Sequence, residues 1–228
     1  VPAAVSICMA LEAARLQSED CPYIYNFVIK NPLIVTDSRL NVYTELKKYQ
    51  KGMSCKIRNN MISSTCKIKS IKKQNDSLEK IGPLKEIENS YLIYGENALF
   101  HGPSFQCIEK IFSDNKDNLI AKIDLEKLVS IPNLNHFWRI VQLLDAAFQS
   151  LALKSMLHER ALRIPTRIDK IEPHFNNHLT KIVYVLASID KLDSELAKGG
   201  VRIINSDRKI LFEMKGVTLK AIKNLQVM

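Results

Sequence analysis

The chain has 228 residues, of which 46% are hydrophobic and 25% are charged, a composition typical of a globular protein. Its 33 Lys and Arg against 24 Asp and Glu give a net charge of +9, which indicates attraction to a nucleic acid, an anionic membrane or an acidic protein. No apolar run approaches the roughly 18 residues of a membrane span, and five scattered cysteines without a C-x-x-C pair indicate neither a disulfide framework nor a zinc knuckle. We therefore expect a reducing, cytoplasmic location and no membrane segment.

The first predicted helix covers residues 2–16. It opens with a proline suited to a first helical turn, and "AAVSICMALEAARL" contains good helix formers that are apolar nearly all round. We expect this helix to be buried. Because the start of the chain lacks a basic region and carries Glu12, we do not expect a signal peptide. Runs typical of strands follow at 23–35, 40–49 and 54–58.

Residues 66–80, "CKIKSIKKQNDSLEK", form the densest basic cluster of the chain. Lysines mix here with Asn, Asp, Ser and Glu, and no aromatic side chain is interleaved that could stack on a base. We expect a solvated segment between two modules that join near residues 70–97. Nucleic-acid binding is the alternative.

A turn and a second helix dominate the next part of the chain. In "LFHGPSFQCIEKIF" (99–112) a Gly-Pro pair forces a turn before an apolar run, which indicates side chains placed in a confined space. A long, mostly apolar helix is predicted over 138–153, and its Asp145 and Gln149 share one face because they are spaced i, i+4.

A strand precedes this helix at 118–125, and further strands are predicted at 161–171, 181–190, 201–205 and 209–222. A helix followed by several strands, twice over, predicts two similar modules.

Four stretches follow one another along the chain: "LFHGPSFQCIEKI", "LLDAAFQSL", "LRIPTRIDKIEPH" and "GVRIINSDRKILFEMKGVTLKAI". In this order they resemble the dehydratase domains of modular polyketide synthases and related fatty acid synthases. The opening "VPAAVSICMALEAA" also resembles the first central helix of that family. The most specific element is the pairing of Gly-Pro-x-Phe-Gln (102–106) with L-L-D-A-A-x-Q (143–149).

This resemblance implies an α+β double hot-dog fold, in which each of two antiparallel sheets wraps one long helix. The halves would be residues 1–85, without the first strands of the N-terminal half, and residues 86–228. The active site would lie in a tunnel between them.

The resemblance also implies a reaction. Family members remove water from a 3-hydroxyacyl chain that phosphopantetheine tethers to an acyl carrier protein, using a histidine as base and an aspartate as acid. Asp145 matches that aspartate, and Gln149 matches the polar residue that orients the acid or the hydroxyl. We expect desolvation to raise the pKa of Asp145, so that it keeps a proton to donate. The alternative is that Asp145 caps the helix start or forms a salt bridge there.

The family places the Gly-Pro turn at the wall of the acyl channel. The residues implied to bind substrate there are Phe100, His101, Gly102, Pro103 and Phe105. His101 stands where the family often has tyrosine; it would donate a hydrogen bond near the thioester or else be satisfied by local backbone. The domain itself would bind no cofactor. Its partners would be the acyl carrier protein and neighbouring synthase domains, with a homodimer as a possible assembly and with neither nucleic acid nor membrane.

The other histidines carry weaker hypotheses. His174 and His178 are spaced i, i+4, which could hold a metal ion on a helix, but no third ligand is evident in the sequence, so we expect none. We expect His136 and His158 to be surface or packing residues.

The sequence departs from the family pattern at two places. The catalytic histidine of the family lies in H-x-x-x-G-x-x-x-x-P; Pro2 corresponds to its proline, so the histidine would lie nine residues earlier, before Val1. The His-Pro that many members carry ahead of L-L-D is replaced by Ile140 and Val141. Either the N-terminal strands are missing, or the domain is a repurposed relative: a product-template domain, a cyclase, an isomerase or a non-catalytic acyl binder. Asp145 argues against an isomerase.

Overall fold

The structure of the protein is a computed structural model that describes residues 2–17, 21–31, 41–59, 61–71, 78–79, 81–87, 93–94, 99, 101–114, 116–159, 161–174 and 177–222. The elements of the N-terminal half are α1 (Ala3–Arg15), β1 (Cys21–Ile29), β2 (Tyr43–Tyr49), β3 (Gly52–Arg58) and β4 (Ile62–Ile71). Those of the C-terminal half are β5 (Lys85–Glu86), the 3-10 helix η2 (Pro103–Phe105), β6 (Lys110–Ser113), β7 (Leu119–Asp124), α2 (Asn135–Met156), β8 (Arg163–Pro173), β9 (Ile182–Leu192), β10 (Leu196–Asn205) and β11 (Ile210–Ala221).

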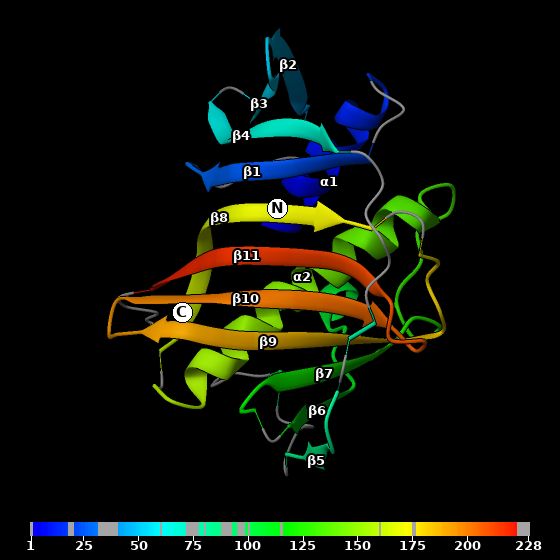
Figure 1. The fold of residues 1–228 in the computed structure, drawn as a ribbon, viewed down its shortest axis with the longest axis vertical. Coiled ribbons are helices and arrows are strands. Elements are labelled where there is room, and N and C mark those ends of the chain that lie inside the picture. Colours follow the sequence, from blue (N-terminus) through cyan, green and yellow to red (C-terminus); the bar gives the residue numbers. More distant parts are fainter. Residues whose placement is uncertain are drawn as a thin grey trace.

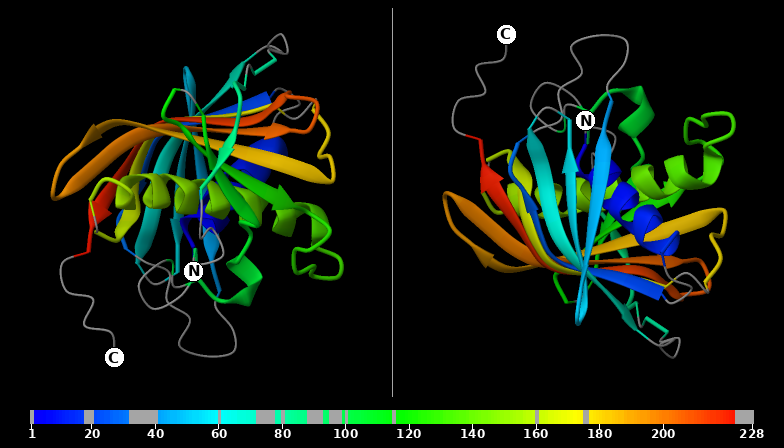
Figure 2. Two further views of the ribbon diagram at one scale, coloured as in Figure 1. Left: turned by 90° about the horizontal axis from the view of Figure 1, so that it is seen from below. Right: turned by 90° about the horizontal axis from the view of Figure 1, so that it is seen from above.

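The two halves share one continuous sheet. Across the described residues, 11 strands pair in the order β2-β3-β4-β1-β8-β11-β10-β9-β7-β6-β5 (Figure 1). Antiparallel pairing of β1 with β8, including Ile24 with Ile171 and Val28 with Arg167, joins the sheets of the two halves edge to edge. Both helices lie on the same face of this sheet (Figure 2).

Each helix is wrapped by the strands of its own half. The helix α1 packs against β1, β2 and β3, α2 packs against β7, β8, β9 and β10, and the two helices touch each other. Every residue of α2 from Ile140 to Ser155 is buried, as expected for a helix that is apolar nearly all round. The predicted double hot-dog fold is confirmed. The second helix begins at Asn135, earlier than the sequence predicted.

Part of the basic segment 66–80 is not the solvated connection that its composition predicted. The stretch from Cys66 to Ile71 belongs to β4, which lies between β3 and β1 in the sheet. Cys66 and Ile68 are buried, whereas Lys67 between them is exposed. This is the period of two that a strand with one buried face shows. The lysines made the stretch look like a linker, although they occupy only the solvent side of a strand.

The junction predicted near residues 70–97 also contains ordered structure. Leu78 forms a β-bridge with Lys209 beside β11. The strand β5 pairs with β6, and neither strand was predicted. The predicted boundary between the halves falls within β5. Residues 32–35 of the first predicted strand lie outside the described part of the chain. None of the helices in the described part is both long and apolar enough to cross a membrane.

Candidate active site

Three polar side chains lie on one face of α2. Gln142, Asp145 and Gln149 follow the spacing i, i+3, i+7, which places them on the same side of a helix. Their exposed fractions are 0%, 5% and 1%. Because a buried polar group is costly without a partner, these side chains need hydrogen-bond partners.

The Gly-Pro turn supplies these partners. Gln142 Nε2 donates to the carbonyl oxygen of Ser104 at 2.8 Å, and Gln149 Nε2 donates to that of Phe105 at 2.8 Å. The Phe105 ring meets the Trp138 ring edge-on, with 5.3 Å between ring centroids. Two hydrogen bonds and an aromatic contact therefore hold the turn against α2.

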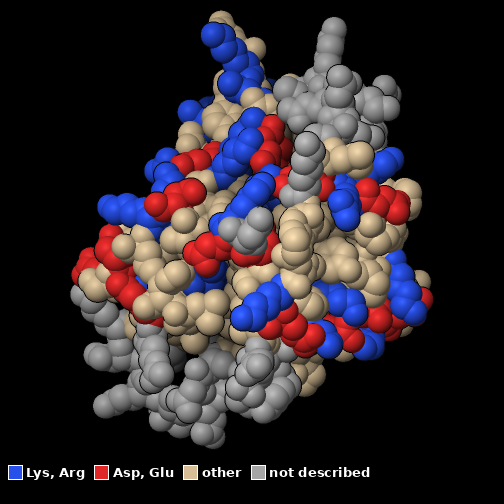
Figure 3. Space-filling model, turned by 60° about the horizontal axis from the view of Figure 1, so that its bottom comes forward, with Lys and Arg blue, Asp and Glu red and all other residues tan. Residues whose placement is uncertain are grey.

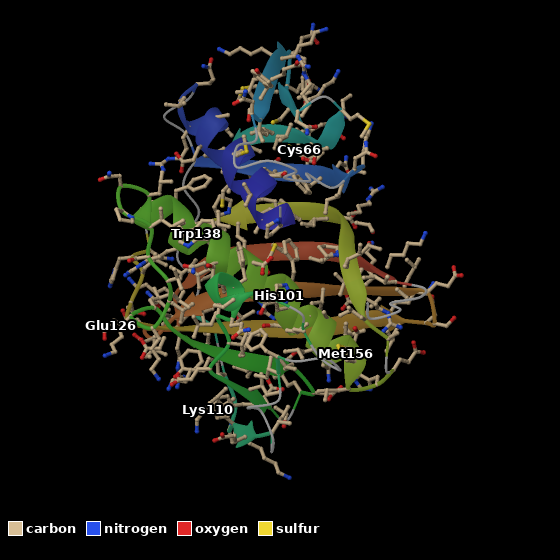
Figure 4. All side chains as sticks on the ribbon, turned by 180° about the vertical axis from the view of Figure 1, so that it is seen from behind. Cys66, His101, Lys110, Glu126, Trp138 and Met156 are labelled. Carbon is tan, nitrogen blue, oxygen red and sulfur yellow. The ribbon has the colours of Figure 1, made fainter. Side chains whose placement is uncertain are left out.

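This attachment places His101 beside Asp145. His101 Nε2 lies 3.5 Å from Asp145 Oδ2, and Gln149 Nε2 donates to the same oxygen at 2.7 Å. Gln106 Nε2 donates to the carbonyl oxygen of His101 at 2.9 Å, which helps to hold the backbone of the turn. Figure 4 shows His101 over the middle of α2, between Trp138 and Met156, which mark its two ends.

The environment shifts the pKa values of both groups. Burial raises the pKa of Asp145 from 3.8 to about 6, against a smaller lowering by the hydrogen bond from Gln149. This is the direction that the sequence predicted. Burial lowers the pKa of His101 below 6.5, which keeps the imidazole uncharged at neutral pH. A carboxylic acid that is half protonated near pH 6 thus lies beside a neutral imidazole.

The alternative of a cap or salt bridge at the helix start is wrong for Asp145. The carboxyl group lies in the buried middle of α2, far from the first residue, Asn135. Its contacts are with the amide of Gln149 and the imidazole of His101.

A cavity of about 450 Å³ opens beside these residues. Both halves of the molecule and both helices contribute to its walls, which are mostly apolar. They comprise Pro2, Ala3, Ser6, Ile29, Asn31, Ser63, Ser64, Leu99, His101, Asp145, Phe148, Gln149, Ala152, Leu162, Arg163, Ile164 and Pro165. A volume of this size is typical of a small-molecule or acyl-chain site.

The structure places the residues predicted from the Gly-Pro turn in different surroundings. His101 lines the cavity, whereas Gly102 and Pro103 are exposed and Phe105 packs on Trp138. These three do not border the cavity. Phe100 lies outside the described residues. A role for the four in substrate binding stays a prediction.

The remaining histidines lie away from this cavity. His174 and His178 are outside any helix, and His178 Nε2 lies 3.8 Å from Asp207 Oδ2. Among the described residues, no group of three or more His, Cys, Asp or Glu is arranged to hold a metal ion. His136 and His158 are exposed, as predicted.

Two residues of the site were not singled out from the sequence. Gln142 could have been found, because its spacing from Asp145 and Gln149 marks one polar face on an apolar helix. Tyr94 carried no such signal. Its hydroxyl donates to Gln149 Oε1 at 2.8 Å, a contact between residues far apart in the chain.

Comparison with known proteins agrees with this architecture. Residues 84–228 match the family described as "Polyketide synthase dehydratase N-terminal domain". No curated protein sequence matches the chain.

Among solved structures, the dehydratase domain from the CurF module of curacin polyketide synthase superposes with a TM-score of 0.78 and 16% identity, covering 97% of this chain and 84% of that one. A trans-AT polyketide synthase dehydratase domain from Brevibacillus brevis gives 0.76 and 18%, covering 97% and 85%. The dehydratase domain of a mycocerosic acid synthase-like polyketide synthase gives 0.76 and 15%, covering 98% and 83%. At these identities the superpositions show only the shared fold. The match to the family model, over residues 84–228, covers well over half of the chain and shows the family. The chain therefore belongs to the polyketide synthase dehydratase family.

Proposed function

We propose that this domain removes water from a 3-hydroxyacyl chain carried on the phosphopantetheine arm of an acyl carrier protein, leaving an enoyl thioester. The observation that carries the proposal is a buried carboxylic acid with a raised pKa on the wall of a mostly apolar cavity. Such a group can donate a proton near neutral pH, and groups with perturbed pKa values gather at functional sites. One similar solved structure, the dehydratase domain of PpsC from Mycobacterium tuberculosis, is a complex with C12:1-CoA.

In this proposal Asp145 is the general acid. A base removes a proton from the carbon next to the thioester carbonyl, and the electron pair of the broken carbon–hydrogen bond forms the new carbon–carbon double bond. The bond from the neighbouring carbon to its hydroxyl breaks, and the hydroxyl takes the proton of Asp145 and leaves as water. Gln149 donates to Asp145 Oδ2, so the proton to be transferred is best placed on Oδ1.

The family resemblance assigns the base to a histidine nine residues before Pro2, outside the sequence described here. Within the chain, His101 is the imidazole next to Asp145, at 3.5 Å, and it is uncharged at neutral pH because burial lowers its pKa. It is therefore the second candidate for the base. General-base catalysis typically contributes about 10² to 10⁴-fold to the rate, so the identity of the base decides whether turnover is measurable.

The acyl carrier protein and neighbouring synthase domains are the partners in this proposal, within a cytoplasmic synthase. The net charge of +9 favours encounter with an acidic carrier protein. On the face shown in Figure 3, Lys and Arg side chains lie among Asp and Glu. This mixture of signs argues against a nucleic-acid surface on that face, because phosphate binding calls for clustered positive charge.

The test is turnover of a 3-hydroxyacyl thioester on a carrier protein, followed as the loss of one water by mass spectrometry. The protein should include the upstream segment that supplies the family histidine. Replacing Asp145→Asn should lower turnover by at least about 10², whereas Asp190→Asn, at an exposed position on β9, should have no effect. Binding of the acyl chain without any loss of water would instead identify a non-catalytic relative.

A further inference from the structure

A hydrogen-bonded chain leads from a backbone amide to the candidate acid. The backbone N–H of Ile108 donates to the hydroxyl oxygen of Tyr94 at 2.9 Å. The hydroxyl donates to Gln149 Oε1 at 2.8 Å, and Gln149 Nε2 donates to Asp145 Oδ2 at 2.7 Å. These three hydrogen bonds thus connect four residues from three parts of the sequence.

Two groups with a single hydrogen-bonding role fix the ends of this network. A backbone N–H can only donate, so the Tyr94 oxygen accepts from Ile108, and its hydroxyl proton is directed at Gln149 Oε1. Oε1 of Gln149 then has to face Tyr94, which turns the NH₂ group toward Asp145. The carbonyl oxygen of Phe105 can only accept, and it takes the second proton of the same NH₂ group at 2.8 Å.

We propose that Tyr94 is a positioning residue that, together with the carbonyl group of Phe105, holds the orientation of the Gln149 amide and thereby decides which oxygen of Asp145 carries the proton. With the NH₂ group facing Oδ2, the proton of the neutral acid would reside on Oδ1, and Oδ1 would be the oxygen that meets a leaving hydroxyl. Tyr94 itself touches neither the reacting carbons nor the leaving group. Its catalytic consequence rests on the proposed role of Asp145 as the acid, but its effect on Asp145 does not.

Loss of the Tyr94 hydroxyl should favour the neutral form of Asp145. Gln149 Oε1 would lose its donor in a buried site, so the amide would be held less firmly and its hydrogen bond to Asp145 Oδ2 would weaken. The hydrogen bond from Gln149 now lowers the pKa of Asp145, so the Tyr94→Phe change should raise that pKa.

Other titratable groups surround the carboxyl. His101 faces it from the turn at 3.5 Å. Burial raises the pKa values of Tyr94 and Cys107, and the charge of Asp145 adds to this shift. Arg163 borders the same cavity from β8 and is paired with Glu159 at 2.5 Å. Tyr94→Phe changes none of these other side chains, so we would assign the shift to the hydrogen-bonded network.

The experiment is a pH titration of the Asp145 carboxyl by ¹³C NMR in the 228-residue chain, without substrate. Tyr94→Phe and Gln149→Leu should each raise its pKa, and the double variant should raise it no further than Gln149→Leu does. Tyr25→Phe is the matched control, because Tyr25 hydrogen-bonds Tyr49 at 2.7 Å on an exposed part of the sheet. It should leave the titration unchanged. An unchanged pKa in Tyr94→Phe, or additive shifts in the double variant, would overturn the proposal.

A measurement on the unaltered protein covers the case in which Tyr94→Phe does not fold. The Tyr94 hydroxyl proton should exchange slowly with water and show a nuclear Overhauser contact to the Gln149 side chain. A freely exchanging hydroxyl proton would contradict the hydrogen bond from Tyr94 to Gln149. In an active protein, Tyr94→Phe should also lower kcat by about 10² with little change in KM, and it should move the alkaline limb of the pH profile upward. A pKa shift in a protein without dehydratase activity would support the positioning role while refuting the proposed reaction.

Discussion

Replacing Asp145→Asn should stabilise the fold, and should do so more strongly as the pH rises. Burial raises the pKa of Asp145 from 3.8 to about 6, whereas an aspartate in the unfolded chain titrates near its ordinary value. Between these two pKa values the folded state binds more protons than the unfolded state, so the free energy of unfolding falls as the pH rises. Since one pKa unit corresponds to about 1.4 kcal/mol, the ionised carboxylate lowers the free energy of unfolding by about 3 kcal/mol above this window.

The assay is urea unfolding of both proteins over the range from about pH 4 to about pH 8. Asn has nearly the same shape as Asp, carries no charge, and can still accept the hydrogen bond from Gln149. We therefore expect the variant to be more stable by about 3 kcal/mol near pH 8 and close to the natural protein near pH 4, where the folded carboxyl is neutral and the unfolded one is only about half ionised.

Asp169→Asn provides a control with the opposite sign. Asp169 lies on β8, where the side chains of Lys198 and Arg167, at 2.8 and 3.0 Å, lower its pKa. Its contribution to stability is present above the unfolded pKa and is lost as the pH falls, so its replacement should cost stability at neutral pH. A difference between Asp145→Asn and the natural protein that does not change with pH would refute the reasoning.

Three further predictions concern the base, the partner and the core. If the base is the histidine nine residues before Pro2, the 228-residue chain alone should show little dehydration, and a longer chain that includes the histidine should be active; robust turnover by the shorter chain, lost in His101→Ala, would make His101 the base. Turnover of carrier-bound substrate should exceed that of the same acyl group on a small thiol, by a margin that shrinks at high salt; equal rates at all salt concentrations would count against steering by charge. Leu151→Ala should lower the free energy of unfolding by about 2–5 kcal/mol in urea titrations, because Leu151 is fully buried in α2; a loss below about 1 kcal/mol would mean that the core repacks around the gap.

Much of the fold could be predicted because both central helices have an unusual pattern. Residues that are apolar nearly all round a helix require strands on several sides, and the sequence supplies such strands after each helix. The strand β4 was missed for the opposite reason: Lys67 and Lys69 dominate its composition, and only the alternation with Cys66 and Ile68 marks it as half-buried. Periodicity was the better guide at this place, because burial depends on the direction of a side chain and not on the mean polarity of a stretch.

The site could be predicted only as far as its motifs extend along the chain. Asp145 and Gln149 stand out because they interrupt an apolar helix, and the Gly-Pro turn marks the segment that carries His101. The contact of Tyr94 with Gln149 joins residues that lie far apart in the sequence, and hydrogen bonds of this kind leave no spacing in the sequence. The same holds for the distance between His101 and Asp145, which Gln142 and Gln149 set by holding the backbone of the turn.

The buried carboxyl group favours catalysis over passive binding of an acyl chain. Folded domains are typically stable by roughly 5–15 kcal/mol, so a carboxylate that costs about 3 kcal/mol above pH 6 removes a large fraction of that margin. An acyl-binding wall would gain nothing from it, because an apolar side chain of similar size would fit the cavity and avoid the cost. The hydrogen bond from Gln149 holds one oxygen of Asp145, which suits a group that donates a proton from its other oxygen. We infer that the cost in stability is retained for proton transfer, and the pH dependence of Asp145→Asn measures that cost without any knowledge of the substrate.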